Sequence, residues 1–168
     1  MMKRTTKVGL GLFAAWAIHD FEELCTMSEN SKQIYGKLPK KAPIPQGLRR
    51  AGMSQKHVRI GTGFMALVMG TAAVLGVRSE GRATFFRAAL LAFGIHGFGH
   101  LALTAAFRQY TSGLATAPTI VIPFWLWARK ELAKEDLSDL NWTTALIALS
   151  LLSLLPAVHG VLYKVLKE

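Results

Sequence analysis

The feature of this sequence that most constrains its fold is a series of long stretches without Asp, Glu, Lys or Arg. They cover residues 60–77, 88–107, 109–128 and 140–163. A helix needs about 20 apolar residues to cross the hydrocarbon core of a bilayer, and each stretch is close to that length. The composition agrees, because 51% of the residues are hydrophobic, slightly more than in ordinary soluble domains. The pattern therefore predicts an integral membrane protein.

A fifth candidate span begins with the apolar run VGLGLFAAWAI and meets Asp20, Glu22 and Glu23 before it can finish crossing. A short basic stretch precedes this run, but no small-residue cleavage site follows it, so we expect the segment to be retained rather than removed as a signal peptide. The sequence thus predicts one all-α domain, a bundle of about five transmembrane helices. The expected spans lie near residues 8–27, 58–77, 84–107, 111–128 and 142–163.

Residues 28–56 form the one sizeable segment outside the predicted spans, and they are strongly basic. The formal net charge of the chain is +10, and this loop contributes Lys32, Lys37, Lys40, Lys41, Arg49, Arg50 and Lys56. Because the charges lie between hydrophobic spans, we expect the loop to rest against anionic lipid headgroups and not to bind nucleic acid. Its run KLPKKAPIPQG predicts irregular or extended backbone. The distribution of Lys and Arg slightly favours a cytoplasmic first loop.

Ionisable side chains inside the predicted spans are the strongest functional signal, because such groups are costly in a bilayer unless they are paired. The first predicted span carries His19, Asp20, Glu22 and Glu23, the third carries His96 and His100, and the fifth carries His159. We expect His57, at the start of the second span, to be interfacial. Asp20 is expected to face away from Glu22, toward headgroups or Arg59. The lone Cys25 is interpreted as a packing residue.

The ionisable residues of the three spans are expected at a common depth. The first, third and fifth helices run in the same direction, and a rise of ~1.5 Å per residue places all of them about 17–24 Å from the same face. Helical geometry puts Glu22 and Glu23 on either side of His19. His96 and His100, four residues apart, share one face of their helix, and neighbouring glycines permit close helix approach. We therefore expect these side chains to meet.

Two histidines and a carboxylate are the minimum set that binds Zn(II) or Fe(II) with positions left open for water or substrate. We expect His96 and His100, together with His19 or His159, to hold one divalent metal, with Glu23 as a further ligand. Glu22 is the expected general base that completes activation of a metal-bound water. This arrangement predicts hydrolysis of an amide or ester in a lipid or peptide substrate. An iron-dependent membrane oxidase would use nearly the same residues.

The run His19-Asp20-Phe21-Glu22-Glu23 resembles the signature of the HXXEE domain family, a group of small bacterial membrane proteins. A second block, HGFGHLALTAAFRQYTSGLATAPTIVIPFWLW, resembles the family's later region, which implies roles for Tyr110, Gly113 and Thr116. Family members commonly have Pro-Gly where this chain has Ser112-Gly113. The resemblance covers about residues 10–127. It implies a multi-pass protein of the bacterial cytoplasmic membrane and supports the site without naming a reaction.

The same residues also fit a function without catalysis. The polar layer could form a transport path, a proton relay or a clamp between helices in a small membrane subunit. His19, Glu22 and Glu23 could instead lie at a helix end and face water, and His159 could cap the bundle. A transporter of this size would need to form a homodimer. An accessory role predicts that Ala at His19, Glu23, His96 and His100 leaves function intact while hydrophobic packing mutations abolish it, whereas the site hypothesis predicts the reverse.

Overall fold

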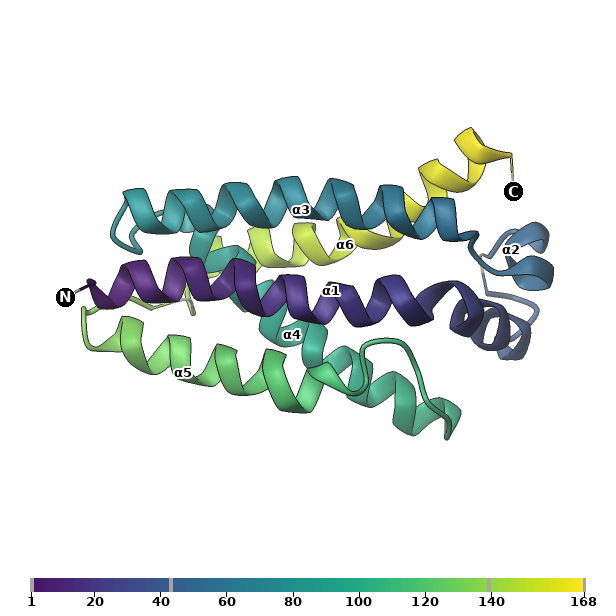
Figure 1. Ribbon diagram of the computed structural model, residues 1–168, viewed down its shortest axis with the longest axis horizontal. Coiled ribbons are helices and arrows are strands. Elements are labelled where there is room, and N and C mark those ends of the chain that lie inside the picture. Colours follow the sequence, from purple (N-terminus) through teal and green to yellow (C-terminus); the bar gives the residue numbers. More distant parts are fainter. Residues whose placement is uncertain (1, 43, 139, 168) are drawn as a thin grey trace.

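The computed structural model describes residues 2–42, 44–138 and 140–167. Its elements are α1 (Arg4–Lys37), α2 (Gln46–Ala51), α3 (Gln55–Arg78), α4 (Thr84–Phe107), the π-helical turn η1 (Ala117–Val121), α5 (Ile122–Ala133) and α6 (Trp142–Leu166). Every regular element among the described residues is helical, which confirms the all-α fold. The long helices run lengthwise beside one another, with the N-terminus at one end of the bundle and α2 at the other (Figure 1).

Three helices are long and apolar enough to cross a membrane, judged over the described part of the chain. These are α3, α4 and α6, with 24, 24 and 25 residues. Apolar side chains on their outer faces are exposed, among them Leu67 and Leu149, as expected for helices in contact with lipid. The predicted first and fourth spans are not in this set. Charged residues run along α1, and η1 and α5 contribute only 5 and 12 residues.

Helix α1 is longer than the first predicted span. It has 34 residues, a length of about 51 Å, and continues ten residues beyond the expected boundary at residue 27. It stops at Lys37, and the next residue, Leu38, is extended. A residue that precedes proline disfavours the helical conformation, and Pro39 follows Leu38, so the helix ends where the sequence predicts a break.

The end of α1 and the described residues up to 58 form a cap over one end of the bundle, and residues 38–42 and 44–45 have no regular helix, as the sequence predicts. Leu48, Met53 and Val58 make a small core there. The Arg49 guanidinium donates hydrogen bonds to the carbonyls of Leu38, Pro39 and Ala42 at 2.7–2.9 Å. Gln46 and Gly47, expected to be irregular, begin α2. Pro45 immediately precedes the first helical residue, near the helix start where proline is tolerated, so this short helix is compatible with the prolines of the segment.

Glycines bring α4 close to its neighbours. A Cβ atom on Gly94 would lie 2.5 Å from the Trp125 ring, and one on Gly97 would lie 2.8 Å from Val121. Helices can approach each other closely where one of them lacks side chains. Gly94 and Gly97 flank His96, so the same residues that allow η1 and α5 to pack on α4 also fix the surroundings of this histidine.

Candidate metal centre

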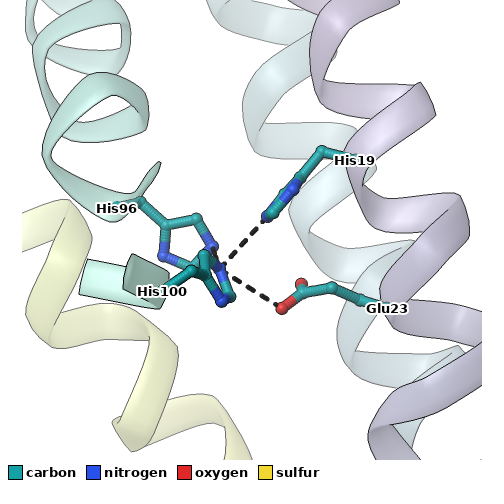
Figure 2. A group of neighbouring side chains, drawn as sticks. All are labelled: His19, Glu23, His96 and His100. Atoms are coloured by element: carbon teal, nitrogen blue, oxygen red, sulfur yellow. Dashed lines mark hydrogen bonds and ion pairs between the residues drawn. The ribbon is translucent and has the colours of Figure 1, made fainter. Parts of the chain in front are cut away.

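Four ionisable side chains from two helices converge in the bundle interior: His19, Glu23, His96 and His100 (Figure 2). One ligand atom from each lies within 4.8 Å of the others. The Nε2 atom of His100 is 2.8 Å from Nε2 of His96 and 3.2 Å from Nε2 of His19. It also lies 3.5 Å from a Glu23 carboxylate oxygen. Three imidazole nitrogens and one carboxylate oxygen thus face a common point.

Helix periodicity explains how α1 and α4 supply two residues each. His19 and Glu23 are four residues apart on α1, and His96 and His100 are four apart on α4, so each pair projects from one face of its helix. His19 is completely buried, and Glu23 is only 6% exposed. Buried carboxylates are rarely found without a partner, and here the partner groups are imidazoles.

The tautomer of His19 follows from its neighbour Thr116. The Thr116 hydroxyl donates its one hydrogen to the Glu22 carboxylate at 2.5 Å, and a carboxylate only accepts. The same hydroxyl oxygen lies 2.7 Å from Nδ1 of His19, so Nδ1 must be the donor in that contact. The hydrogen therefore sits on Nδ1, and the lone pair of Nε2 faces the cluster. Metal-bound histidines are typically oriented by such a bond from the other ring nitrogen.

Glu22 binds the segment between α4 and η1 rather than facing the cluster. Its carboxylate accepts hydrogen bonds from the Tyr110 hydroxyl, from the Thr116 hydroxyl and from the backbone N–H groups of Ala115 and Thr116 at 3.1 and 2.8 Å. Partial burial and the bond to Glu22 raise the pKa of Tyr110, so the phenol remains a donor. Four donors therefore surround the Glu22 carboxylate, and its oxygens are engaged with this segment and not with the four clustered side chains.

Two further residues of α1 hold the same segment, residues 110–116, and sequence reasoning missed both. Thr26 Oγ1 lies 2.7 Å from the Ser112 hydroxyl. The Asn30 side chain donates to the Tyr110 carbonyl at 2.9 Å and accepts from the Ser112 N–H at 3.0 Å. Their positions, seven and eleven residues after His19, repeat on one face of a helix. That spacing is the signal by which they could have been found.

Gly113 is required at its position for two reasons. Its φ angle is +83°, in the region that residues with a Cβ rarely adopt. A Cβ atom would also lie 2.5 Å from Cε1 of His100 and 2.8 Å from Cε1 of His19. The segment 110–116 therefore packs its backbone directly on two imidazoles of the cluster.

The structure places His159 with His57 and not with the four clustered residues. Nε2 of His57 lies 3.0 Å from Nδ1 of His159, and the two rings are stacked with centroids 5.1 Å apart. His57 is completely buried within the protein and lies in the first turn of α3. Gly61 explains the contact, because it leaves room for His159 on α6 to approach the first turns of α3. The sequence prediction had grouped His159 with the cluster only because of its expected depth in the membrane.

A cavity of about 70 Å³ adjoins the cluster between α1, α3, α4 and α6. Glu23 and His96 form part of its wall, and so does Asp20. Asp20 is 7% exposed and accepts a hydrogen bond from the Thr62 hydroxyl, so it faces the interior and not headgroups or Arg59. Cys25, expected to be a packing residue, is exposed. Asp20 is thus the carboxylate that shares a cavity with two members of the cluster.

Comparison with known proteins gives one match. A family model described as "Protein of unknown function with HXXEE motif" matches residues 10–128. Comparisons with curated proteins and with solved structures found no match. The matched region includes all four clustered residues as well as Glu22 and the segment 110–116, whereas His159 lies outside it. The chain belongs to the family of proteins with the HXXEE motif.

Proposed function

We propose that this protein is a five-span membrane hydrolase with one divalent metal bound by His19, Glu23, His96 and His100. The observation that carries the proposal is the convergence of four ligand atoms within 4.8 Å. Three imidazole nitrogens with one carboxylate oxygen are a donor set suited to Zn(II) or Fe(II). The Nδ1–H tautomer of His19, deduced from Thr116, turns the lone pair of Nε2 toward the proposed metal.

Two features support five crossings. Helix α1 exposes Leu10, Ile18 and Phe21 by 53%, 51% and 68%, while its carboxylates at Asp20 and Glu23 are buried, which is the inverse of a water-facing helix. It also lies along α3 (Figure 1), one of the three apolar helices. The fourth crossing would be formed by η1 and α5, which together have 5 and 12 residues and a length of about 25 Å. This is shorter than a bilayer core of ~30 Å, so the crossing would require local thinning of the bilayer. Trp127 and Arg129 near its end are suited to the interface.

The proposed chemistry is addition of water to an ester or amide carbonyl. A divalent metal at these ligands supplies a Lewis acid and makes bound water easier to deprotonate. We assign the general base to Asp20, because it borders the cavity beside Glu23 and His96. Asp20 accepts the proton as the water oxygen bonds to the carbonyl carbon. The bond from that carbon to the alcohol or amine then breaks, and the proton passes to the leaving group. The reaction involves no oxidation or reduction.

The test is the metal content of detergent-solubilised protein purified without chelator, measured by mass spectrometry. We expect about one zinc or iron per chain in the wild type and a loss of it in His96→Ala and Glu23→Ala. His159→Ala is the matched control and should retain the metal, because His159 lies with His57. A wild type without stoichiometric metal would overturn the proposal. Iron instead of zinc would favour the oxidase, which uses the same ligands.

A second candidate function, a proton pathway without catalysis, has support from the second histidine pair. His57 and His159 are in contact, and His159 and His96 line the same cavity. Chains of histidines and carboxylates inside membranes are typical of proton relays. This candidate predicts proton flux into liposomes that falls on His159→Ala, in a protein that carries no metal. The hydrolase predicts no such flux.

A further inference from the structure

The cavity beside the proposed metal centre is larger than a single water molecule requires. Its volume is about 70 Å³, several times the ~10–15 Å³ that a single water molecule needs. Most of its wall is apolar, and cavities of that kind hold hydrocarbon in preference to water. The cavity is therefore suited to a ligand with an apolar part.

The two ends of the cavity differ in polarity. Helices α1, α4 and α6 run in one direction and α3 runs in the other (Figure 1), so the order of residues along each helix gives their order along the cavity. The ionisable or hydroxyl groups at the end nearer the cap are Asp20, Glu23, Thr62, His96 and His159. The side chains toward the other end are apolar, among them Trp16, Met65, Met69, Phe93, Leu151 and Leu155. The polar groups thus lie toward the cap end of an apolar chamber, with Met27 of α1 beyond them.

We infer that the cavity binds the hydrocarbon chain of a single-chain lipid, with the ester or amide of that lipid beside Glu23 and His96. The inference rests on the proposed function and names its substrate class. From Ala89 to His96 the wall extends about 10 Å along α4, which fits a segment of one chain. A peptide is disfavoured, because its backbone N–H and C=O groups would have no partners along the apolar part.

The test uses a long-chain alkylglycerol with a diazirine near the end of its chain. The ether bond of this probe is not an ester or amide and is not hydrolysed. The protein is reconstituted into phosphatidylcholine nanodiscs, exposed to the probe, irradiated and mapped by mass spectrometry. We expect adducts on cavity residues such as Met65, Met69 and Leu155, in excess over the lipid-facing residues Leu67 and Leu149.

A matched pair of variants on α4 sharpens the result. Ala92→Leu adds bulk to the cavity wall and should reduce the cavity adducts at least tenfold. Ala102→Leu adds the same bulk to an exposed position and should leave them unchanged. Both variants should retain the metal. Wild-type adducts confined to Leu67, Leu149 and other exposed positions would overturn the inference, even where Ala92→Leu does not fold.

The outcomes separate this inference from the metal proposal. Stoichiometric metal with adducts only on lipid-facing residues would leave the metal proposal intact and overturn the single-chain pocket. Cavity adducts in a protein without metal would support the pocket and overturn the metalloenzyme. Cavity adducts that an excess of unlabelled alkylglycerol removes would support binding at a defined site, whereas adducts that persist would overturn it.

Discussion

At the scale of single residues, the hydroxyl group of Thr116 links a glutamate of the HXXEE motif, Glu22, to its histidine, His19. Thr116 donates to Glu22 and accepts from His19, so Glu22 acts on His19 through an intervening side chain. The second glutamate, Glu23, reaches the histidine cluster directly. The two adjacent glutamates of the HXXEE motif therefore differ in their contacts, because Glu22 reaches His19 only through Thr116 and Glu23 contacts His100 directly.

Replacement of this hydroxyl should weaken metal binding without removing a ligand. We expect Thr116→Val to lower zinc affinity by about 10- to 100-fold, the usual effect of losing a residue that orients a metal-bound histidine. Thr116→Ser keeps a hydroxyl and should restore most of the affinity. Thr119→Val is the control, because the Thr119 hydroxyl bonds only the Ala115 carbonyl in the described contacts. Calorimetric titration of the metal-free protein with zinc measures each value, and equal affinities would contradict the assigned role.

The meeting of His19, Glu23, His96 and His100 could be anticipated from the sequence, because helix rise fixes depth and a spacing of four fixes the shared face. The partner of His159 could not. A lone histidine has no periodic pattern that shows which face of its helix points inward. Its depth along the helix was therefore predicted, but its neighbouring side chain, His57, was not. The orientation of the Glu22 side chain could not be predicted either, because it depends on contacts with the segment 110–116. The conformation of that segment follows from Gly113 and not from helix geometry.

At the scale of elements, the cap shows how a basic segment becomes ordered. Arg49 bonds three carbonyls that follow the end of α1, where carbonyl groups have lost their helical partners. The Arg49 side chain therefore makes its contacts within the protein, while the side chains of Lys40, Lys41 and Arg50 remain exposed. Prolines in the sequence indicated where α1 stops, but the cap itself depends on contacts between residues distant in the chain.

Loss of these bonds should loosen the cap and leave the metal centre unaffected. We expect Arg49→Ala to cost about 1.5–3 kcal/mol of local stability, the range for hydrogen bonds that involve a charged group. Hydrogen–deuterium exchange should therefore become faster in residues 35–42. Arg50→Ala removes a neighbouring exposed charge and should leave exchange unchanged. Unaltered exchange in Arg49→Ala would show that packing of Leu48 and Met53 alone holds the cap.

At the scale of the whole molecule, five crossings place the chain ends on opposite faces. Lys3, Arg82 and Lys134 would lie on one face, and Lys40 and Lys164 on the other. Each of these residues is exposed, so each can be replaced by cysteine in a Cys25→Ser background. The slight excess of basic residues on the cap side predicts that this side is cytoplasmic.

Labelling with a membrane-impermeant maleimide tests that arrangement. In right-side-out vesicles we expect reaction at Lys3→Cys, Arg82→Cys and Lys134→Cys and protection at Lys40→Cys and Lys164→Cys. Inside-out vesicles should give the reverse. If Lys134→Cys reacted together with Lys40→Cys, η1 and α5 would not cross. If Lys3→Cys reacted together with Lys40→Cys, α1 would not cross. A complete inversion of the pattern would keep five spans and reverse only the orientation.

The segment 110–116 and the cavity lie against different members of the cluster. Thr116 and Gly113 contact His19 and His100, while the cavity wall includes Glu23 and His96. In the five-span arrangement the segment joins α4 to η1 at the cap side, with Tyr110 exposed, and the cavity extends into the membrane interior. In that arrangement the proposed metal centre would stand at a boundary between two phases. Water and hydrocarbon, which do not mix, would each reach it from their own side.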